Sequence, residues 1–254
     1  MPSEISVISL ADDLAHLGLR PGDPVMVHSS FKSLGIDDPE SIIRAILQVI
    51  GETGTLLMPA LSYNQQPPLV HNTLTTPACV GFLAEYFRTR SGSQRSLHPT
   101  HSVCAVGAQV HALLDDHMND ATPCGEHSPF NLLLQRGGRI LMLGCGLKPN
   151  TSMHAIEEYV RPSYLFGEPV TYTITDQNGR TFRKTYVPHS FEGFNQRYDR
   201  ITDILDAWQL RRGMVGRADS HLIDGAALLA QALAHLQRDP FYFVDRETEA
   251  PNAQ

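Results

Sequence analysis

Hydrophobic residues form two different patterns in the first two thirds of the chain. Spacings of three and four residues, as at Leu10, Leu14 and Leu17, are typical of amphipathic helices, whereas short unbroken apolar runs are typical of buried strands. The helical spacing is found at residues 4–18, 39–50, 81–90, 108–116 and 128–136. The apolar runs are found at residues 25–28, 55–61, 102–107 and 139–145, and residues 62–79 are predicted to be a long polar loop. Because strands and helices alternate, we expect an α/β fold with a largely parallel or mixed sheet flanked by helices on both faces.

The last third of the chain changes to strict alternation. Residues 170–175 and 181–187 alternate between apolar and polar side chains, and the pair Asn178-Gly179 between them is a strong signal for a hairpin turn. Further expectations are helices at about 194–208 and 222–236 and a frayed tail at 247–254. No repeat or linker divides the sequence, so all 254 residues are predicted to form one domain with a C-terminal β-hairpin elaboration at about 165–190.

Composition narrows the class of protein. A chain of 254 residues with 42% hydrophobic and 19% charged residues is long enough for one large α/β core. No apolar run reaches the ~18 residues that a membrane span needs, and the first residues lack the pattern of a signal peptide. The four cysteines form no CxxC pair and are typical of reduced thiols, so we expect a cytoplasmic protein. As a separate expectation, the protein is either a monomer or a homodimer. A net charge of −7 argues against nucleic-acid binding and is compatible with a cationic substrate.

The junction between the strand at 139–145 and the next helix carries the most suggestive polar pattern. A helix is predicted to begin at Thr151 or Ser152, and Thr151, His154 and Glu157 then share one of its faces. A hydroxyl, an imidazole and a carboxylate in a row are suited to proton transfer. The same pattern is also typical of a capped helix with a buried histidine, and spacing alone favours that second interpretation.

Four other polar segments are candidate sites, and each also has an ordinary structural interpretation. The segment from His28 to Gly35 places serines just after a strand, where backbone N–H groups can approach an anion, but it is also typical of a serine-rich turn. Arg95 and Ser96 together have the charge and hydroxyl to hold a phosphate. Ser128 precedes a proline, as a helix cap does. His189 follows the hairpin, where it can contact a substrate or be an ordinary solvent-exposed loop residue.

The motifs give little support to metal-dependent or serine-dependent hydrolysis. His98, His101 and Cys104 have a spacing that hints at metal ligands, but no second cluster completes the set, so we expect no metal. No Gly-x-Ser-x-Gly motif supports a serine nucleophile, although Ser29 or Ser30 remains available to a distant histidine.

Five segments taken together resemble one known family. They are Val25–Gly35, Gly54–Ala60, Arg95–Val103, Gly125–Phe130 and Asn150–Glu157. In this order and at these intervals they resemble the aminoglycoside 3-N-acetyltransferases, an antibiotic acetyltransferase family distinct from the GNAT fold. The likeness covers roughly residues 10–235.

The resemblance implies acetyl-CoA as donor and an amine as acceptor, and the chemistry of that transfer requires neither a metal nor a covalent enzyme intermediate. It implies that His154 is the general base, that Glu157 orients it, and that Thr151 lies near the thioester. The residues implied to hold the pantetheine and phosphates of CoA are His28, Ser29, Ser30, Ser33, Leu34, Arg95 and Ser96, with Val103 and Phe130 as nearby apolar contacts. An ammonium cannot attack a thioester, so removal of its proton by an imidazole is consistent with these residues.

One segment departs from the family pattern. The resistance enzymes carry an acidic stretch after the hairpin, whereas this chain reads His-Ser-Phe-Glu-Gly-Phe at 189–194. His189 and Glu192 are therefore the candidates for the acceptor side. The predicted function is acetylation of the 3-amino group of 2-deoxystreptamine aminoglycosides. The alternatives are the same chemistry on another small amine or amino sugar, a serine- or metal-dependent hydrolase, and a non-catalytic CoA-binding protein.

Overall fold

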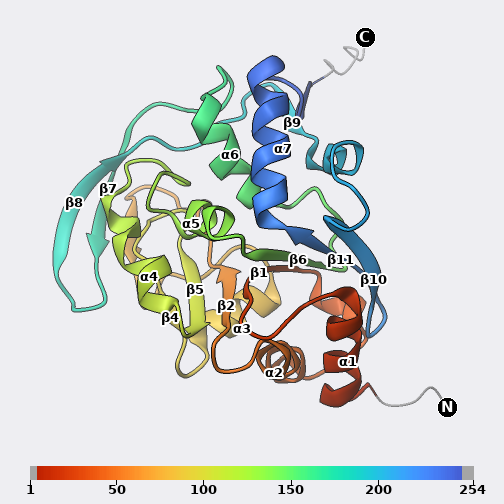
Figure 1. Cartoon of the computed structure of the whole chain (residues 1–254). Coiled ribbons are helices and arrows are strands. Elements are labelled where there is room, and N and C mark those ends of the chain that lie inside the picture. Colours follow the sequence, from red (N-terminus) through yellow and green to blue (C-terminus); the bar gives the residue numbers. More distant parts are fainter. Residues whose placement is uncertain (1–4, 248–254) are drawn as a thin grey trace, which may run out of the picture.

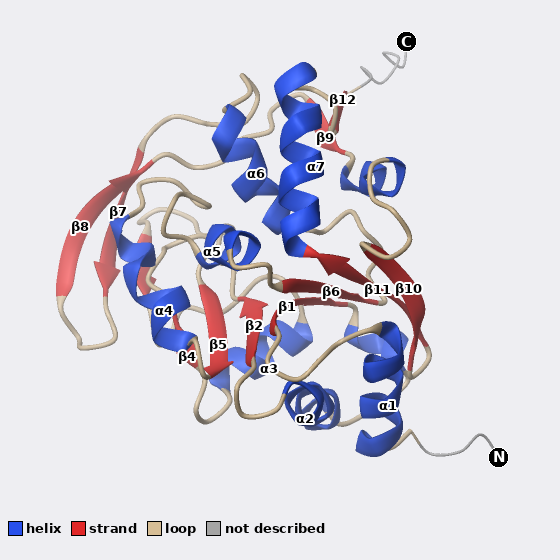
Figure 2. Ribbon diagram, viewed as in Figure 1, coloured by secondary structure: helices blue, strands red, loops and turns tan. Residues whose placement is uncertain are grey.

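A mixed seven-stranded sheet runs through the middle of the computed structural model, which describes residues 5–247 (Figures 1 and 2). Its strand order is β10-β11-β6-β1-β2-β5-β4. The strands are β1 (Pro24–Ser29), β2 (Thr55–Pro59), β4 (Gln94–Arg95), β5 (Val103–Gly107), β6 (Arg139–Leu143), β10 (Leu210–Val215) and β11 (Ala218–Asp224). Strand β1 pairs in parallel with β2 and β6, and the outer strands pair antiparallel. The predicted α/β class with a mixed sheet is confirmed.

Helices cover both faces of this sheet, as the strand patterns require. One face carries α1 (Val7–Leu17), α2 (Pro39–Ile50) and α3 (Phe82–Thr89), and the other carries α4 (Val110–Leu114), α5 (Pro129–Gln135), α6 (Ser152–Val160) and α7 (Gly225–Arg238) (Figure 1). Successive side chains of a strand point to opposite faces. In β1, Val25 and Val27 therefore pack in one core while Met26 packs in the other. An unbroken apolar strand is thus the sign of a sheet buried on both sides.

Side-chain caps set several helix starts where the sequence places them. The Ser128 hydroxyl accepts the N–H of Asn131, with Pro129 at the first helical position, so the capping interpretation of Ser128 is confirmed. Asp38 caps α2 in the same way, and Asp224 caps α7. None of the helices in the described part of the chain is both long and apolar enough to span a membrane.

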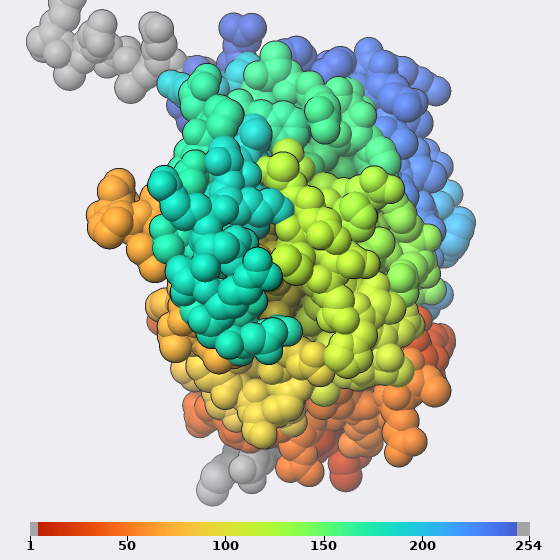
Figure 3. Space-filling view, turned by 90° about the vertical axis from the view of Figure 1, so that its left-hand side faces the viewer, coloured from red at the N-terminus to blue at the C-terminus, as the bar shows by residue number. Residues whose placement is uncertain are grey.

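The predicted hairpin is formed by β7 (Val170–Thr175) and β8 (Thr181–Tyr186). Its turn is held by Asp176, whose carboxylate accepts the N–H groups of Asn178 and Arg180, and Gly179 takes a positive φ of 80°. A third strand, β3 (Val70–Asn72), adds to β7 from within the loop predicted at 62–79. In Figure 3 the hairpin lies along one side of the molecule, next to the segment that contains α4.

One predicted element near the C-terminus is wrong, and another is confirmed with a later start. The helix expected at about 194–208 is instead β9 (Phe194–Gln196), which pairs with β12 (Val244–Arg246), followed by the short 3-10 helix η3 (Tyr198–Asp203). The helix expected at 222–236 begins later, because β11 continues to Asp224. Strands β10 and β11 were missed because charges and a glycine interrupt the apolar pattern of this edge hairpin. The predicted frayed tail lies outside the described residues from 248 onward.

Candidate active site

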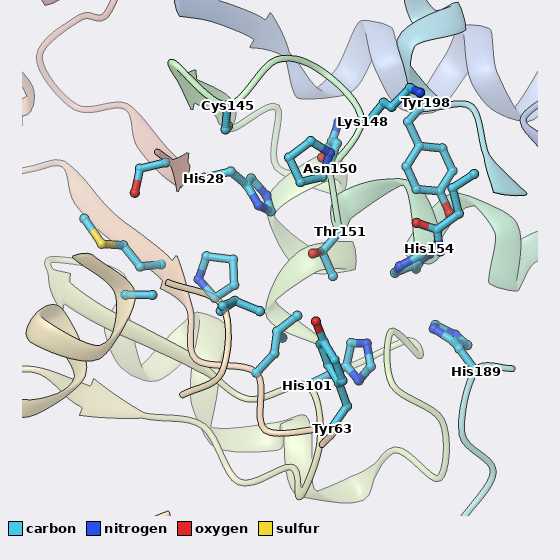
Figure 4. A pocket seen from close by; sticks show the side chains of 18 of the residues that line it. His28, Tyr63, His101, Cys145, Lys148, Asn150, Thr151, His154, His189 and Tyr198 are labelled. Atoms are coloured by element: carbon cyan, nitrogen blue, oxygen red, sulfur yellow. Dashed lines mark hydrogen bonds between the residues drawn. The ribbon is translucent and has the colours of Figure 1, made fainter. Parts of the chain in front are cut away.

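A cavity of about 550 Å³ opens where the parallel strands end. Residues at the carboxyl ends of β1 and β2 form one wall, and the turn from β6 into α6 forms another (Figure 4). The third wall comes from the loop between β8 and β9. The carboxyl edge of an open α/β sheet is the usual ligand site, and this volume is within the range of small-molecule pockets.

His154 lies in the cavity wall with one ring nitrogen held from behind. Its Nδ1 is 3.0 Å from Glu157 Oε2 and 2.9 Å from the Tyr198 hydroxyl. Tyr198 also donates to Glu157 Oε2 at 2.7 Å, and Tyr164 donates to Glu157 Oε1 at 2.8 Å. The spacing of three residues thus brings the predicted pair into contact, and Glu157 rather than Glu158 is the partner.

This network fixes the protonation pattern of the imidazole. The Glu157 side chain is fully buried, and a carboxylate accepts hydrogen bonds only. The proton of neutral His154 therefore resides on Nδ1, and the lone pair resides on Nε2, which is the nitrogen left for the cavity. Burial and the neighbouring Glu157 raise the pKa of Tyr198 well above its usual value, so Tyr198 stays a donor.

Thr151 occupies the N-cap position of α6 but does not cap it. The Asn150 side chain does so instead, because its Oδ1 accepts the N–H of Ser152 at 3.2 Å. Thr151 lines the cavity, and among the described residues its hydroxyl has no hydrogen-bond partner. The helix start therefore presents a free hydroxyl donor near His154 (Figure 4).

His189 is buried in the site instead of facing solvent. Its side chain is 5% exposed, and its Nε2 lies 2.8 Å from Glu158 Oε1. Glu158 also accepts the N–H of Cys124 at 2.7 Å and the hydroxyl of Thr122, so it ties the His189 loop to α6. Burial lowers the pKa of His189 well below its usual value, with the nearby His154 adding to the effect. The interpretation of His189 as an exposed loop residue is therefore wrong.

Glu192, the second acceptor-side candidate, is exposed and does not line the cavity. Of the described residues that do line it, none is an aspartate or glutamate, and Lys148 is its cation. The loss of acidic residues noted in the sequence is therefore also a property of the cavity wall.

The segment from the end of β1 to Leu34 divides into residues inside and outside the cavity. His28 and Ser29 line it, and burial lowers the pKa of His28 to about 3. Ser33 instead donates its hydroxyl to the backbone carbonyl of Ser30 at 2.7 Å, closing a turn. Leu34 is fully buried in a hydrophobic core. The structure therefore brings two of the five residues of this predicted CoA segment into the cavity.

The segment around Arg95 serves the fold. Arg95 is 8% exposed, and its guanidinium donates to four oxygen atoms of the chain, namely the carbonyls of Ala60, Thr73 and Thr76 and the hydroxyl of Ser102. Its donors are thus engaged away from the cavity, which contradicts the expected phosphate contact.

The other predicted CoA contacts, Ser96, Val103 and Phe130, also serve the fold. The Ser96 hydroxyl bonds to His117 Nδ1 at 2.9 Å and accepts the N–H of Val103 at 2.9 Å. Val103 and Phe130 are fully buried in the core beneath α4 and α5. None of these three residues lines the cavity, so the structure does not place them against a ligand there.

Sequence reasoning missed several residues of the site. Tyr198 and Tyr164 complete the network around Glu157, and Tyr63, His101 and Lys148 line the cavity. His101 lies in the segment Arg95–Val103, but its spacing to His98 and Cys104 was interpreted as a possible metal motif and not as a sign that it lines the cavity. The two tyrosines gave no local signal, because each reaches Glu157 from outside its helix.

Comparisons with known proteins agree with one another. A family model described as "Aminoglycoside 3-N-acetyltransferase" matches residues 26–237. The chain is 33% identical to aminoglycoside N(3)-acetyltransferase VII of Streptomyces paromomycinus, over 90% of each chain. The aminoglycoside acetyltransferase AAC(3)-IVa, solved as a histidine-to-alanine mutant in complex with a gentamicin, superposes with a TM-score of 0.82 at 29% identity, covering 96% of this chain and 92% of its own. AAC-IIIb, solved as a binary complex with CoASH, gives 0.82 at 28% identity, covering 98% and 100%.

Proposed function

The chain belongs to the aminoglycoside 3-N-acetyltransferase family, and we propose that His154 is the general base of its reaction. The chain is an acetyltransferase that uses acetyl-CoA and acts on the 3-amino group of aminoglycosides. The single observation that carries the proposal is the arrangement of His154, with Nδ1 held by the buried Glu157 and Nε2 left for the cavity.

The chemical step follows from that arrangement. His154 Nε2 takes a proton from the acceptor nitrogen as the nitrogen attacks the carbonyl carbon of the thioester. The new C–N bond forms, the C–S bond breaks, and the CoA thiolate leaves and takes its proton from the imidazolium, which returns His154 to its neutral form. The imidazolium formed on His154 is stabilised by the Glu157 carboxylate 3.0 Å away. A positioned base of this kind contributes about 10²–10⁴-fold to the rate.

Two groups around the base support the step. Tyr198 and Tyr164 hold the Glu157 carboxylate in place, so Glu157 and the tyrosines are positioning residues rather than catalytic ones. The free hydroxyl of Thr151 is a suitable donor to the oxyanion that develops on the thioester carbonyl. No resident metal enters this mechanism.

The donor side of the cavity is formed by the strand ends and by the turn after β6. His28 and Ser29 offer polar groups at the edge where parallel strands bind ligands, and Lys148 offers a cation for the phosphates of CoA in place of Arg95. Because acetyl-CoA is a metabolite of the cytoplasm, we assign the reaction to that compartment.

The acceptor side lies toward His189 and Phe191, the latter with its ring 5.0 Å from that of His154. Neighbouring structures contain gentamicin and sisomicin, which supports a polycationic acceptor here. The absence of carboxylates among the described lining residues favours, as a second candidate, a smaller amine or amino sugar with fewer charges.

The test of the base is the His154→Ala substitution. We expect the turnover number to fall at least about a hundredfold while CoA binding is retained, because a general base contributes ~10²–10⁴-fold. CoA binding is measured by calorimetry, and turnover by release of the CoA thiol. Unchanged turnover would refute the assignment.

The acceptor is identified with a panel of amines in the same assay. Aminoglycosides with a free 3-amino group should be acetylated, and aminoglycosides blocked at that nitrogen should not. A higher kcat/KM for a simple amino sugar than for any aminoglycoside would favour the second candidate. Thiol release without any amine would indicate hydrolysis instead.

A further inference from the structure

Three imidazoles gather at one end of the active-site cavity. They are His101, in the turn before β5, His154 on α6, and His189 in the loop after β8 (Figure 4). One nitrogen from each ring lies within 4.8 Å of the corresponding nitrogens of the other two. The mechanism above uses only His154 as a base, so the convergence of three rings requires a separate explanation.

Each of the three rings is held through one nitrogen, which leaves the other free. His154 Nδ1 meets Glu157 at 3.0 Å, His189 Nε2 meets Glu158 at 2.8 Å, and His101 Nδ1 meets the Thr100 hydroxyl at 2.9 Å. Carboxylates and hydroxyls behind imidazoles orient metal-ligating histidines in the same way and keep a lone pair on the opposite nitrogen. The supporting groups of a three-histidine metal site are therefore present.

The free nitrogen of His189 is a second and independent observation. Its Nδ1 is buried, and among residues 5–247 it has no hydrogen-bond partner. The His189 side chain is 5% exposed, and burying a polar atom without a partner costs free energy. An ion bound between the three rings removes that cost.

We propose that His101, His154 and His189 bind one divalent transition-metal ion of the zinc class, and that this ion inhibits acetyl transfer. Imidazole nitrogen selects zinc, copper, nickel and cobalt over the oxygen-preferring magnesium and calcium. Zinc–nitrogen bonds of ~2.0–2.1 Å place tetrahedral ligands about 3.3 Å apart, so the rings must close in from their present spacing.

Inhibition follows because the metal takes the same electron pair as the proton. A base needs the lone pair of His154 Nε2, and a metal ion bound there occupies it. The ion is therefore an inhibitor and not a cofactor. The inhibition rests on the proposed role of His154, whereas the binding of metal does not.

Cobalt is the direct probe of binding, because Co²⁺ held by imidazoles absorbs visible light. Titration of the metal-free full-length chain, without an affinity tag, should produce a visible band that saturates at one ion per chain and is displaced by Zn²⁺. His101→Ala and His189→Ala should each abolish the band. His189→Gln is a second test in case His189→Ala disturbs folding: its amide can still donate to Glu158, and it should also abolish the band. His111→Ala, at an exposed histidine, and Cys145→Ser, at a thiol lining the cavity, are the matched controls and should retain it.

The activity arm separates the two proposals. Zn²⁺ should lower acetyl transfer at the same stoichiometry, and a chelator should restore it in full. A band that is absent from the wild-type chain, or that survives His189→Ala, would overturn the metal site and leave the proposed function untouched. Cobalt binding with undiminished transfer would overturn the inhibition and count against His154 as the base.

Discussion

At the residue scale, the behaviour of His154 depends on which of two adjacent carboxylates supports it. Glu157 contacts His154 Nδ1, whereas Glu158 contacts His189. Both carboxylates are buried, and burial raises the pKa of Glu158. The two residues are therefore neighbours in sequence with different tasks, one behind the base and one behind the loop of the acceptor side.

Substitution of these carboxylates by their amides should separate the two tasks. Glu157→Gln removes the charge that stabilises the imidazolium, so we expect kcat to fall roughly tenfold to a hundredfold, part of the ~10²–10⁴-fold that a base supplies, with little change in the KM of the acceptor. Glu158→Gln is the matched control and should alter mainly the KM of the acceptor through His189. Steady-state kinetics with both substrates varied measures kcat and the KM of the acceptor separately for each variant. A larger loss of kcat for Glu158→Gln would reverse the two assignments.

The sequence predicts contacts within one helix far better than contacts between elements. The pairing of His154 with Glu157 was predictable because three residues along a helix place two side chains on one face. Tyr198 stands 44 residues from His154, on a 3-10 helix that the pattern predicted as an ordinary helix. Its hydroxyl reaches Glu157 only through tertiary packing, which no local period records.

At the element scale, the same distinction explains which strands were predicted. The β7–β8 hairpin was predicted correctly because its turn is specified locally by Asp176, Asn178 and Gly179. Strands β10 and β11 were missed because their pairing with β6 is a long-range contact and their side chains alternate with charges. Arg95 was misjudged for a related reason, since nothing in its sequence shows that it is buried.

Arg95 joins three segments and should therefore affect stability before it affects ligand binding. Arg95→Met leaves the carbonyls of Thr73 and Thr76 without their donor and removes one partner from the Ala60 carbonyl and the Ser102 hydroxyl, which still bond to each other. Each unsatisfied group costs about 1–3 kcal/mol. We expect the free energy of unfolding, measured in urea, to fall by about 3 kcal/mol or more. Arg212→Met, which removes an exposed ion pair with Asp219, should cost no more than about 1 kcal/mol. Unaltered stability of Arg95→Met with a much higher KM for acetyl-CoA would restore Arg95 to the CoA site.

At the scale of the whole molecule, the chain buries half of its twelve histidines. Burial is the largest cause that lowers the pKa at His28, His71, His98, His101, His117, His189 and His221. For His28, His71 and His117 the pKa falls to about 3. These groups couple the stability of the fold to pH.

The sign of that coupling is fixed by which state binds the proton. Between pH 6.5 and about 3 the unfolded chain protonates these histidines while the folded chain does not, so acid favours unfolding. Above pH 6.5 both states are neutral and the histidines contribute no slope. Raised pKa values at Asp120, His127 and Glu158 act in the opposite direction, but they are fewer. The free energy of unfolding should therefore be flat near pH ~7.5 and fall steeply below pH 6.5.

His71 offers the sharpest measurement of this effect, because it is fully buried and neither of its ring nitrogens has a hydrogen-bond partner within residues 5–247. Each such histidine adds about 1.4 kcal/mol to the loss of stability per pH unit. His71→Leu should therefore flatten the slope of unfolding free energy between about pH 6 and pH 5 by about that amount, whatever it does to stability near neutral pH. His111→Leu removes an exposed imidazole and should leave the slope as it is. Equal slopes in the wild type and in His71→Leu would mean that His71 is not held neutral by the fold, and that the acid sensitivity arises elsewhere.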